Sequence, residues 1–273
     1  MPQRLFDSGR QMQIKRKRWL TGAALAATAV AVVACATSPT GRSQLRLISE
    51  AHLNQMGSAA FTEMKQELPA TQSASTRRYV ECVTNNILPF IPGQIDWEVQ
   101  TFESDQVNAF ALPGGKIGVY TGLLKVAKNQ DQLAAVIGHE IAHVIAGHSG
   151  ARVSNQMATQ FGVAIFSAAT GMGGDLIGAG ANMLLVLPNS RGDESESDIL
   201  GMRYMAEAGF NPSAAVQLWQ NMAAEAGGRS PAEFTSTHPS HDTRIRDLNA
   251  ELANSMPIYE RARSAGRQPN CRR

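Results

Sequence analysis

Two histidines four positions apart, His139 and His143, and the Glu140 that follows the first of them form the pattern H-E-x-x-H. The surrounding run, 130–147, contains good helix formers, no proline, and apolar residues at three- and four-residue spacings, so it predicts a mostly buried helix. Residues four apart lie one turn apart on one helix face, so both imidazoles can bind a single zinc ion. Glu140 lies on the adjoining flank, where a carboxylate can polarise a water molecule bound to the metal. The pattern therefore predicts a zinc-dependent hydrolytic site.

A third zinc ligand has to come from further along the chain, and two places offer candidates. On a continuing helix, at about 100° per residue, His148 would point roughly opposite His139. We therefore expect His148 to interact with the last carbonyls of the helix or with water. The second place is the start of another helical run, where Glu194 and Asp198 lie one turn apart. Glu194 could bind the metal and Asp198 could accept the free N–H of a bound imidazole, although a solvated acidic helix start is the alternative interpretation.

Four motifs together resemble peptidase family M48, the HtpX and Ste-type gluzincin metallopeptidases. The motifs are NAFALPGGKIGVYTGLL (108–124), HEIAHVIAGH (139–148), SRGDESESD (190–198) and THP (237–239). More narrowly, they resemble the bacterial periplasmic lipoprotein members such as LoiP and BepA, without the tetratricopeptide repeats of BepA. The resemblance implies a predominantly helical α+β fold: a gluzincin-like zinc metallopeptidase domain with a small β-sheet beside the H-E-x-x-H helix.

The resemblance also assigns roles to individual residues. The family's general base falls on Glu140, and its zinc ligands fall on His139, His143 and Glu194. The family usually reads E-x-E-A-D, and Ser197 replaces the alanine here without displacing either carboxylate. The family's downstream histidine falls on His238, which we expect to donate a hydrogen bond to the developing oxyanion. Two alternatives stay open: His241 could take that role, or His238 could occupy the fourth position on the metal and close the site.

These residues predict a zinc metalloendopeptidase with one Zn²⁺ per chain. The resemblance to the family further implies that the substrate pairs as a strand with the edge strand near 108–112, so recognition would act mainly through the backbone and sequence preference would be weak. The expected substrates are misfolded or misassembled envelope proteins. The alternative function is a zinc-bearing chaperone or assembly factor for outer-membrane proteins with little proteolysis. Residues 35–273 carry 19 Lys and Arg against 22 Asp and Glu, which argues against nucleic acid as a partner.

The beginning of the chain predicts where this chemistry takes place. A basic cluster at 15–18 precedes an apolar stretch at 19–34, which is shorter than the roughly 20 residues of a membrane-spanning helix and suits a signal peptide. The stretch ends in Val-Val-Ala before Cys35, which resembles the bacterial lipobox. We therefore expect lipid on Cys35 and, because Ala36 follows it, anchoring at the periplasmic face of the outer membrane. An ordinary signal peptide that happens to contain a cysteine is the alternative.

The chain divides into a signal peptide (1–34), a lipidated cysteine with its linker (35–48), a metallopeptidase domain (49–256) and a basic C-terminal tail (257–273). Within the domain we expect helices at 49–67 and 74–88, a pair of helices in 151–188, and a last helix at 241–253. Strands are expected at 95–102, 107–112 and 116–120. Cys82 and Cys271 either form a disulfide, as an oxidising compartment would favour, or remain a buried and a free thiol.

Overall fold

The computed structural model describes residues 35–170, 188–225, 237–238 and 244–273. The predicted signal peptide, His241 and most of the expected second helix of 151–188 lie outside these residues. The chain forms two compact units, one ending at Leu47 and the other beginning at Ile48. In the first unit, β1 (Cys35–Thr37) and β2 (Ser43–Leu45) pair as an antiparallel hairpin. Gly41 lies between the two strands with a φ of 91°, a conformation that glycine adopts without strain.

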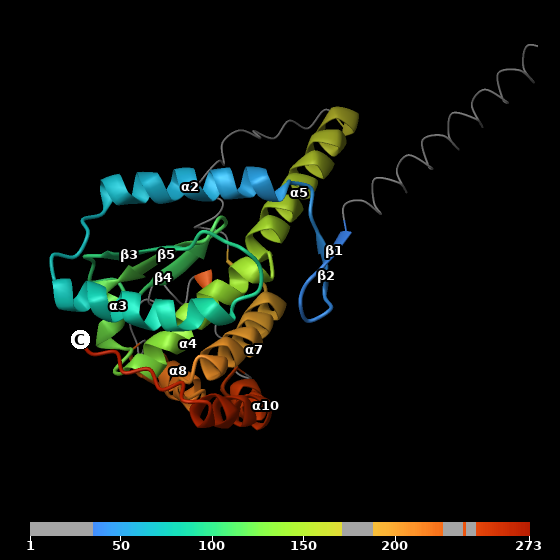
Figure 1. Cartoon of the computed structure of the whole chain (residues 1–273). Helices are drawn as coiled ribbons and strands as arrows, with labels where there is room; N and C mark the ends of the chain where they lie inside the picture. The colour runs from blue at the N-terminus through green and yellow to red at the C-terminus, as the bar shows by residue number, and fades with distance from the viewer. Residues whose placement is uncertain (1–34, 171–187, 226–236, 239–243) are drawn as a thin grey trace, which may run out of the picture. The chain divides into compact units, whose positions relative to one another are not determined.

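The second unit is an α+β domain in which helices predominate, as the sequence predicted. Its helices are α2 (Glu50–Glu67), α3 (Ala74–Ile87), α4 (Gln130–Ile145), α5 (His148–Thr170), α7 (Arg191–Glu207), α8 (Ser213–Glu225) and α10 (Arg244–Ser264). Two short 3₁₀ helices are η1 (Leu88–Phe90) and η2 (Thr121–Lys125), and the strands are β3 (Glu98–Phe102), β4 (Ala109–Leu112) and β5 (Lys116–Tyr120). Figure 1 shows the three strands between α2 on one side and α3 and α4 on the other.

The three strands form one mixed sheet in the order β3-β5-β4. β3 is parallel to β5, whereas β4 and β5 form an antiparallel hairpin. Gly114 and Gly115 turn the hairpin with φ values of 80° and 76°, which a connection this tight requires. β5 is the only partner of β4 among the strands that the structure describes, so the other side of β4 is an edge.

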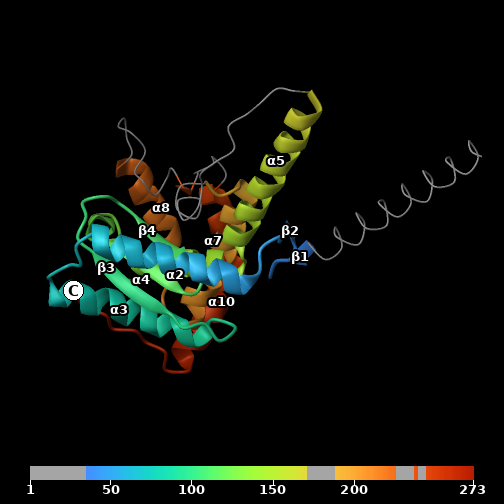
Figure 2. The same ribbon diagram turned by 90° about the horizontal axis from the view of Figure 1, so that it is seen from above.

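Alternation along β4 decides which helix covers each face of the sheet. Phe110 and Leu112 pack in a cluster with the apolar side of α2, which Figure 2 shows running across the sheet. Ala109 and Ala111 face the other way and belong to the main core with α3 and α4. Because alanine side chains are small, α4 can lie close to the sheet on this face.

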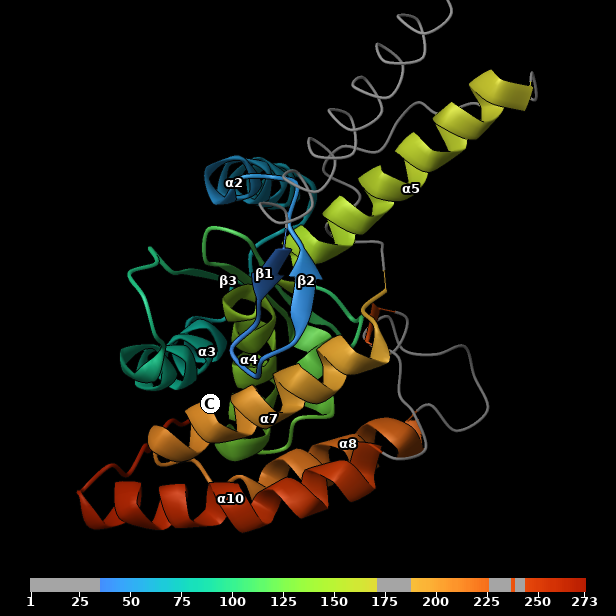
Figure 3. The ribbon, with the colours of Figure 1, turned by 90° about the vertical axis from the view of Figure 1, so that its right-hand side faces the viewer.

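α4 is the central helix of the domain, and all of its residues from Gln132 to His143 are buried. Figure 3 shows α4 passing behind α7. Two glycines meet where these helices contact each other. A Cβ placed on Gly138 would lie 2.9 Å from the carbonyl oxygen of Gly201, and one on Gly201 would lie 2.7 Å from the backbone nitrogen of His139. The absence of side chains at both positions therefore lets the backbones of the two helices touch.

The last helix is longer than the sequence predicted. We expected it to end at Ala253, but α10 continues through Pro257 to Ser264. Proline lacks one backbone N–H and usually disrupts a helix. Here the buried face of the helix continues beyond it, because Leu248 and Ser255 before the proline and Ala262 after it are all buried. Packing against α7 and α8 thus outweighs the local cost of the proline.

The residues after α10 lie along α3 and the start of α4. Cys271 forms a disulfide with Cys82 of α3, with an S–S distance of 2.03 Å. The side chain of Gln130 accepts a hydrogen bond from the backbone N–H of Cys271 and donates one to the carbonyl of Pro269, at 2.8 and 2.9 Å. Arg267 packs its guanidinium over the ring of Phe90. The end of the basic tail is therefore held on the domain by covalent and polar contacts.

Candidate metal centre

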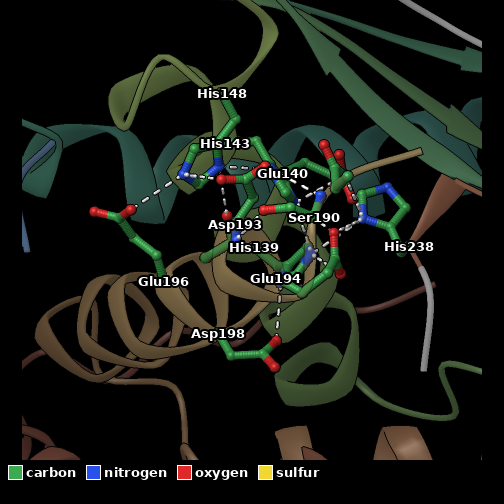
Figure 4. Close-up of polar contacts among 12 residues, drawn as sticks. His139, Glu140, His143, His148, Ser190, Asp193, Glu194, Glu196, Asp198 and His238 are labelled. Atoms are coloured by element: carbon green, nitrogen blue, oxygen red, sulfur yellow. Dashed lines mark hydrogen bonds and ion pairs between the residues drawn. The ribbon is translucent and has the colours of Figure 1, made fainter. Parts of the chain in front are cut away.

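Four buried side chains converge between α4 and α7: His139, His143, Glu194 and His238. One ligand atom from each lies within 4.8 Å of all the others. The Nε2 atoms of His139 and His143 are 3.0 Å apart, and Glu194 Oε1 lies 3.4 Å from the second of them. Figure 4 shows the four side chains pointing toward one another. We call this group the four-residue cluster.

Helix geometry and a helix cap bring the first three members together. His139 and His143 are one turn apart on α4, as H-E-x-x-H requires. Glu194 lies in the first turn of α7, which begins with a capping box: the Ser190 side chain accepts from the Asp193 N–H, and the Asp193 carboxylate accepts from the Ser190 N–H. The cap fixes the start of α7 and so fixes the direction of the Glu194 side chain.

His238 completes the cluster from the short segment before α10. Its Nδ1 lies 3.1 Å from Glu194 Oε1 and 3.2 Å from His139 Nε2. The backbone N–H of Asn189 donates to the carbonyl of Thr237 at 3.0 Å, so the segment is attached to the start of α7. The structure therefore places His238 among the three predicted ligands rather than at the rim of the site.

Two observations indicate that zinc fits this cluster. First, two imidazoles and one carboxylate are a common ligand set of catalytic zinc. Second, Glu140 Oε1 is a buried carboxylate oxygen that makes no hydrogen bond within the described part of the chain, and His238 Nε2 lies 3.4 Å from it. A buried unsatisfied oxygen is costly unless the site takes up a further group such as water. The backbone N–H of Ala111 in β4 hydrogen-bonds the same carboxylate.

His139 has the carboxylate partner that the sequence predicted. Asp198 Oδ1 lies 2.9 Å from His139 Nδ1. The residue behind this pair is Arg244, which is 1% exposed and which the sequence motifs did not indicate. Its Nη1 donates to Glu194 Oε2 at 2.8 Å and its Nη2 donates to Asp198 Oδ1 at 2.7 Å, while its guanidinium stacks on Trp219 at 3.4 Å from the ring centroid. One arginine thus holds both a ligand carboxylate and the carboxylate that orients His139.

The expectation for His148 was wrong. The side chain is fully buried, and its Nδ1 lies 2.8 Å from His143 Nδ1. The expectation assumed that one helix continues through this position. Instead α4 ends at Ile145, and Gly147, with a φ of 69°, turns the chain before α5 begins at His148. The glycine therefore directs the imidazole back toward α4, and a break marked by glycine inside the motif was the signal that could have indicated this.

Burial and charge set the proton affinities of the site before a metal ion is added. Burial raises the pKa of Glu140, which suits a proton acceptor. Burial also opposes ionisation of Glu194, but contacts with the imidazoles of His139, His143 and His238 outweigh it and hold its pKa far below the usual range. For His139 burial acts against the charged form, yet hydrogen bonds to Asp198 and Glu194 raise its pKa to about 9. Burial lowers the pKa of His143. A metal ion would therefore displace a proton from His139.

A sequence model of peptidase family M48 matches residues 71–252, which is more than half of the chain and includes every member of the four-residue cluster. The chain belongs to peptidase family M48. Its curated relatives include the mitochondrial metalloendopeptidase OMA1 of Schizosaccharomyces pombe, 39% identical over 180 residues that cover 65% of this chain and 53% of the relative. The human OMA1 is 29% identical over 240 residues, covering 81% of this chain and 44% of the relative.

Bacterial members of the M48 family match as well. The beta-barrel assembly-enhancing protease of Escherichia coli K12 is 28% identical over 169 residues, covering 57% of this chain and 34% of the relative. The M48 chain thus spans between about a third and about half of the length of these three relatives. The comparisons confirm the family. They do not single out the periplasmic lipoprotein members, because mitochondrial relatives match at equal or higher identity.

Cys35 is an exposed free cysteine at the start of β1. Within the ranges that the structure describes, no helix combines the length and the apolar character that crossing a bilayer would need. The apolar stretch 19–34 lies outside those ranges.

Proposed function

We propose that this M48 protein is a zinc endopeptidase whose metal is held by His139, His143 and Glu194. The observation that carries the proposal is the meeting of these three side chains with the buried Glu140 carboxylate, one oxygen of which has no hydrogen-bond partner in the described residues. A bound zinc ion would lower the pKa of water and polarise the carbonyl of a peptide bond. Each remaining requirement of peptide hydrolysis falls to a side chain of this site.

Glu140 is the proton carrier in this proposal. It accepts the proton of the attacking water and passes it to the leaving amine of the peptide. The raised pKa of its carboxyl group supports both steps, because a group that is too acidic would hold the proton too weakly to deliver it. The Ala111 N–H fixes one side of the carboxylate, which keeps the other oxygen directed into the site.

Glu140→Gln tests this role. The amide has nearly the same shape but cannot take a proton, so zinc content should stay at about one per chain while casein digestion nearly disappears. Glu63→Gln on the exposed side of α2 is the matched control and should change neither quantity. Digestion by Glu140→Gln within a few-fold of the unaltered protein would exclude Glu140 as the proton carrier.

His238 supports a closed resting state of the site. In the structure His238 Nδ1 lies 3.1 Å from Glu194 Oε1, and Nε2 of the predicted ligand His143 lies 3.4 Å from the same oxygen. A ring in that place would fill the fourth position on the metal, and peptide binding would then require the segment that carries His238 to move. This geometry favours closure over the oxyanion-donor role that the sequence suggested.

His238→Ala separates the two roles, because they predict changes of opposite sign. If His238 closes the site, the variant should keep zinc and digest casein faster than the unaltered protein. If His238 instead donates to the oxyanion, turnover should fall about 100- to 1000-fold. Zinc analysis on the same samples checks that the metal site is intact, and an unchanged rate would remove His238 from both roles.

The free edge of β4 is the proposed substrate-binding strand. It lies directly beside the Glu140 carboxylate through the Ala111 N–H. An extended peptide that pairs with this edge would be recognised through its backbone, with weak sequence preference. This mode suits unfolded or misassembled proteins. By its name, the relative in E. coli enhances assembly of β-barrel proteins, which also supports the alternative of a zinc-bearing assembly factor with little proteolysis.

We propose that this activity resides at the periplasmic face of the outer membrane, attached by lipid on Cys35. The lipobox-like sequence before this exposed residue supports the proposal. Mass spectrometry of membrane-extracted protein should find an acylated N-terminal Cys35, and Cys35→Ser should release the protein or leave its signal peptide uncleaved. A mature N-terminus at another residue would contradict the anchor. An active but unlipidated protein would leave the peptidase proposal standing.

A further inference from the structure

We propose that His148 is a positioning residue of the zinc site, and that it acts as the middle member of a relay running from His143 to Glu196. The relay rests on the proposed zinc-binding function, which it deepens. His148 Nδ1 lies 2.8 Å from His143 Nδ1, and His148 Nε2 lies 3.2 Å from Glu196 Oε2. His148 and Glu196 are 0% and 2% exposed. These contacts lie on the side of His143 that faces away from the cluster.

The proton positions in this relay follow from its two ends. The cluster lies at Nε2 of His143, which is 3.0 Å from Nε2 of His139, so a neutral imidazole that binds metal through this atom carries its proton on Nδ1. That N–H donates to His148 Nδ1, which must then be unprotonated. His148 therefore carries its own proton on Nε2 and donates it to the Glu196 carboxylate. With one proton on His143 Nδ1 and one on His148 Nε2, each contact between His143 and Glu196 has one donor and one acceptor.

The opposite arrangement is disfavoured by charge. It would place a proton on His143 Nε2, where it could face Glu194 Oε1 at 3.4 Å but would block metal binding, and it would leave the lone pair of His148 Nε2 facing the Glu196 carboxylate. Asp193 Oδ1, 3.7 Å from the same nitrogen, adds a second negative group there. The Ser197 hydroxyl lies 3.3 Å from His148 Nδ1, and because it can donate or accept it does not select either arrangement. The buried carboxylate thus selects the tautomer of His143 that can bind zinc.

The geometry of α7 explains why His143 reaches a carboxylate only through His148, whereas His139 contacts a carboxylate directly. Glu194 and Asp198 are four residues apart and share a face of α7, so Asp198 reaches the imidazole of His139 directly. Glu196 lies between them in sequence and points to another side of the helix, as Figure 4 shows. It contacts His148 instead, which the turn at Gly147 has placed beside His143.

Glu196→Gln is the sharpest test, because the side chain keeps its shape. A carboxylate only accepts hydrogen bonds, whereas an amide can accept from or donate to His148 Nε2 and so no longer selects a tautomer. Zinc binding, measured by competition with a chromophoric chelator, should weaken about 10- to 100-fold, as is typical for loss of a partner behind a metal ligand. Glu63→Gln, on the exposed side of α2, is the matched control and should bind zinc as the unaltered protein does.

His148→Phe is the second variant and should weaken zinc binding over the same range, because an aromatic ring remains at this position but both polar contacts are lost. Thermal unfolding of the metal-free variants identifies any that fail to fold. Nitrogen-15 NMR of labelled histidines gives a readout that a merely structural role would not change. In metal-free protein His143 should carry its proton on Nδ1, and in Glu196→Gln it should become a mixture of the two tautomers.

Two results would overturn the relay. One is zinc affinity within twofold of the unaltered protein in Glu196→Gln, and the other is a His143 that keeps the Nδ1 proton in that variant. Failure of the peptidase proposal looks different. In that case the unaltered protein would bind zinc and show the Nδ1 tautomer of His143, yet would not digest casein.

Discussion

Arg244 shows how much of a metal site can depend on one side chain outside the ligand set. Its two terminal nitrogens hold Glu194 and Asp198 at 2.8 and 2.7 Å in the interior. Removing one partner of a buried ion pair typically costs about 3–5 kcal/mol, because the remaining charge stays buried without a partner. Here two carboxylates would lose their partner together. The guanidinium also stacks on Trp219, which fixes the plane in which its two terminal nitrogens lie.

Arg244→Lys should therefore fold less stably and bind zinc more weakly. Lysine keeps the charge, but its single ammonium group cannot reproduce two separate N–H donors in one plane. The thermal midpoint should fall, and the rise in midpoint on adding Zn²⁺ should shrink, because that rise reports differential affinity for the folded state. Arg203→Lys is the control and should have little effect on either quantity. Arg203 pairs with Glu251, but its side chain is 42% exposed.

Spacing predicts the side chains that lie on one helix face, and no more. His139 and His143 share a face of α4 and Glu194 and Asp198 share one of α7, so the periodicity of the helix was enough to group them. His148 depends on a turn between two helices, and Arg244 depends on where α10 packs against α7 and α8. Gly147 marks the turn that places His148, whereas tertiary packing places Arg244, and the spacing of residues along the chain predicts neither position.

At the scale of elements, the crossing of α4 and α7 determines the distance between ligands on two helices. The backbones touch at Gly138 and Gly201. A side chain at this point has no flexible neighbour to displace, because the nearest atoms are backbone atoms of the other helix. Any change here moves His139 relative to Glu194.

Gly201→Ala should push the two helices apart. The new Cβ would lie 2.7 Å from the His139 backbone nitrogen, so we expect a loss of about 1–3 kcal/mol in the free energy of unfolding, as for other overpacked interiors. Zinc affinity should fall in parallel. Gly150→Ala in α5 is the control, since its Cβ meets only the end of the Leu53 side chain, at 2.8 Å. Urea unfolding and chelator competition measure both, and a Gly201→Ala protein as stable as the control would contradict the close approach.

Element boundaries were predictable where a cap marks them. α2 and α3 begin after Ser49 and Ser73, whose side chains accept from the backbone N–H groups of His52 and Thr76. The end of α10 carries the opposite local signal, because Pro257 normally disrupts a helix. Its continuation follows from packing alone, and for that reason the sequence placed the end too early.

At the scale of the molecule, the disulfide between Cys82 and Cys271 joins residues 189 positions apart. Closing so long a loop removes many conformations from the unfolded chain, and native disulfides typically contribute about 2–4 kcal/mol in this way. The Cys82→Ser, Cys271→Ser double variant should lose stability of that order in urea unfolding. Its zinc content should stay at one per chain, because neither cysteine belongs to the four-residue cluster. Equal stability of the variant and the oxidised protein would contradict a stabilising bridge.

The same bridge has a consequence for the fate of a damaged molecule. The disulfide encloses both zinc-binding helices, so a single backbone cut anywhere between Cys82 and Cys271 leaves two polypeptides that are still one covalent molecule. A protease molecule nicked by another copy could then keep every ligand at its metal. Such nicked protein would migrate as one species on a non-reducing gel and separate into two fragments only after reduction.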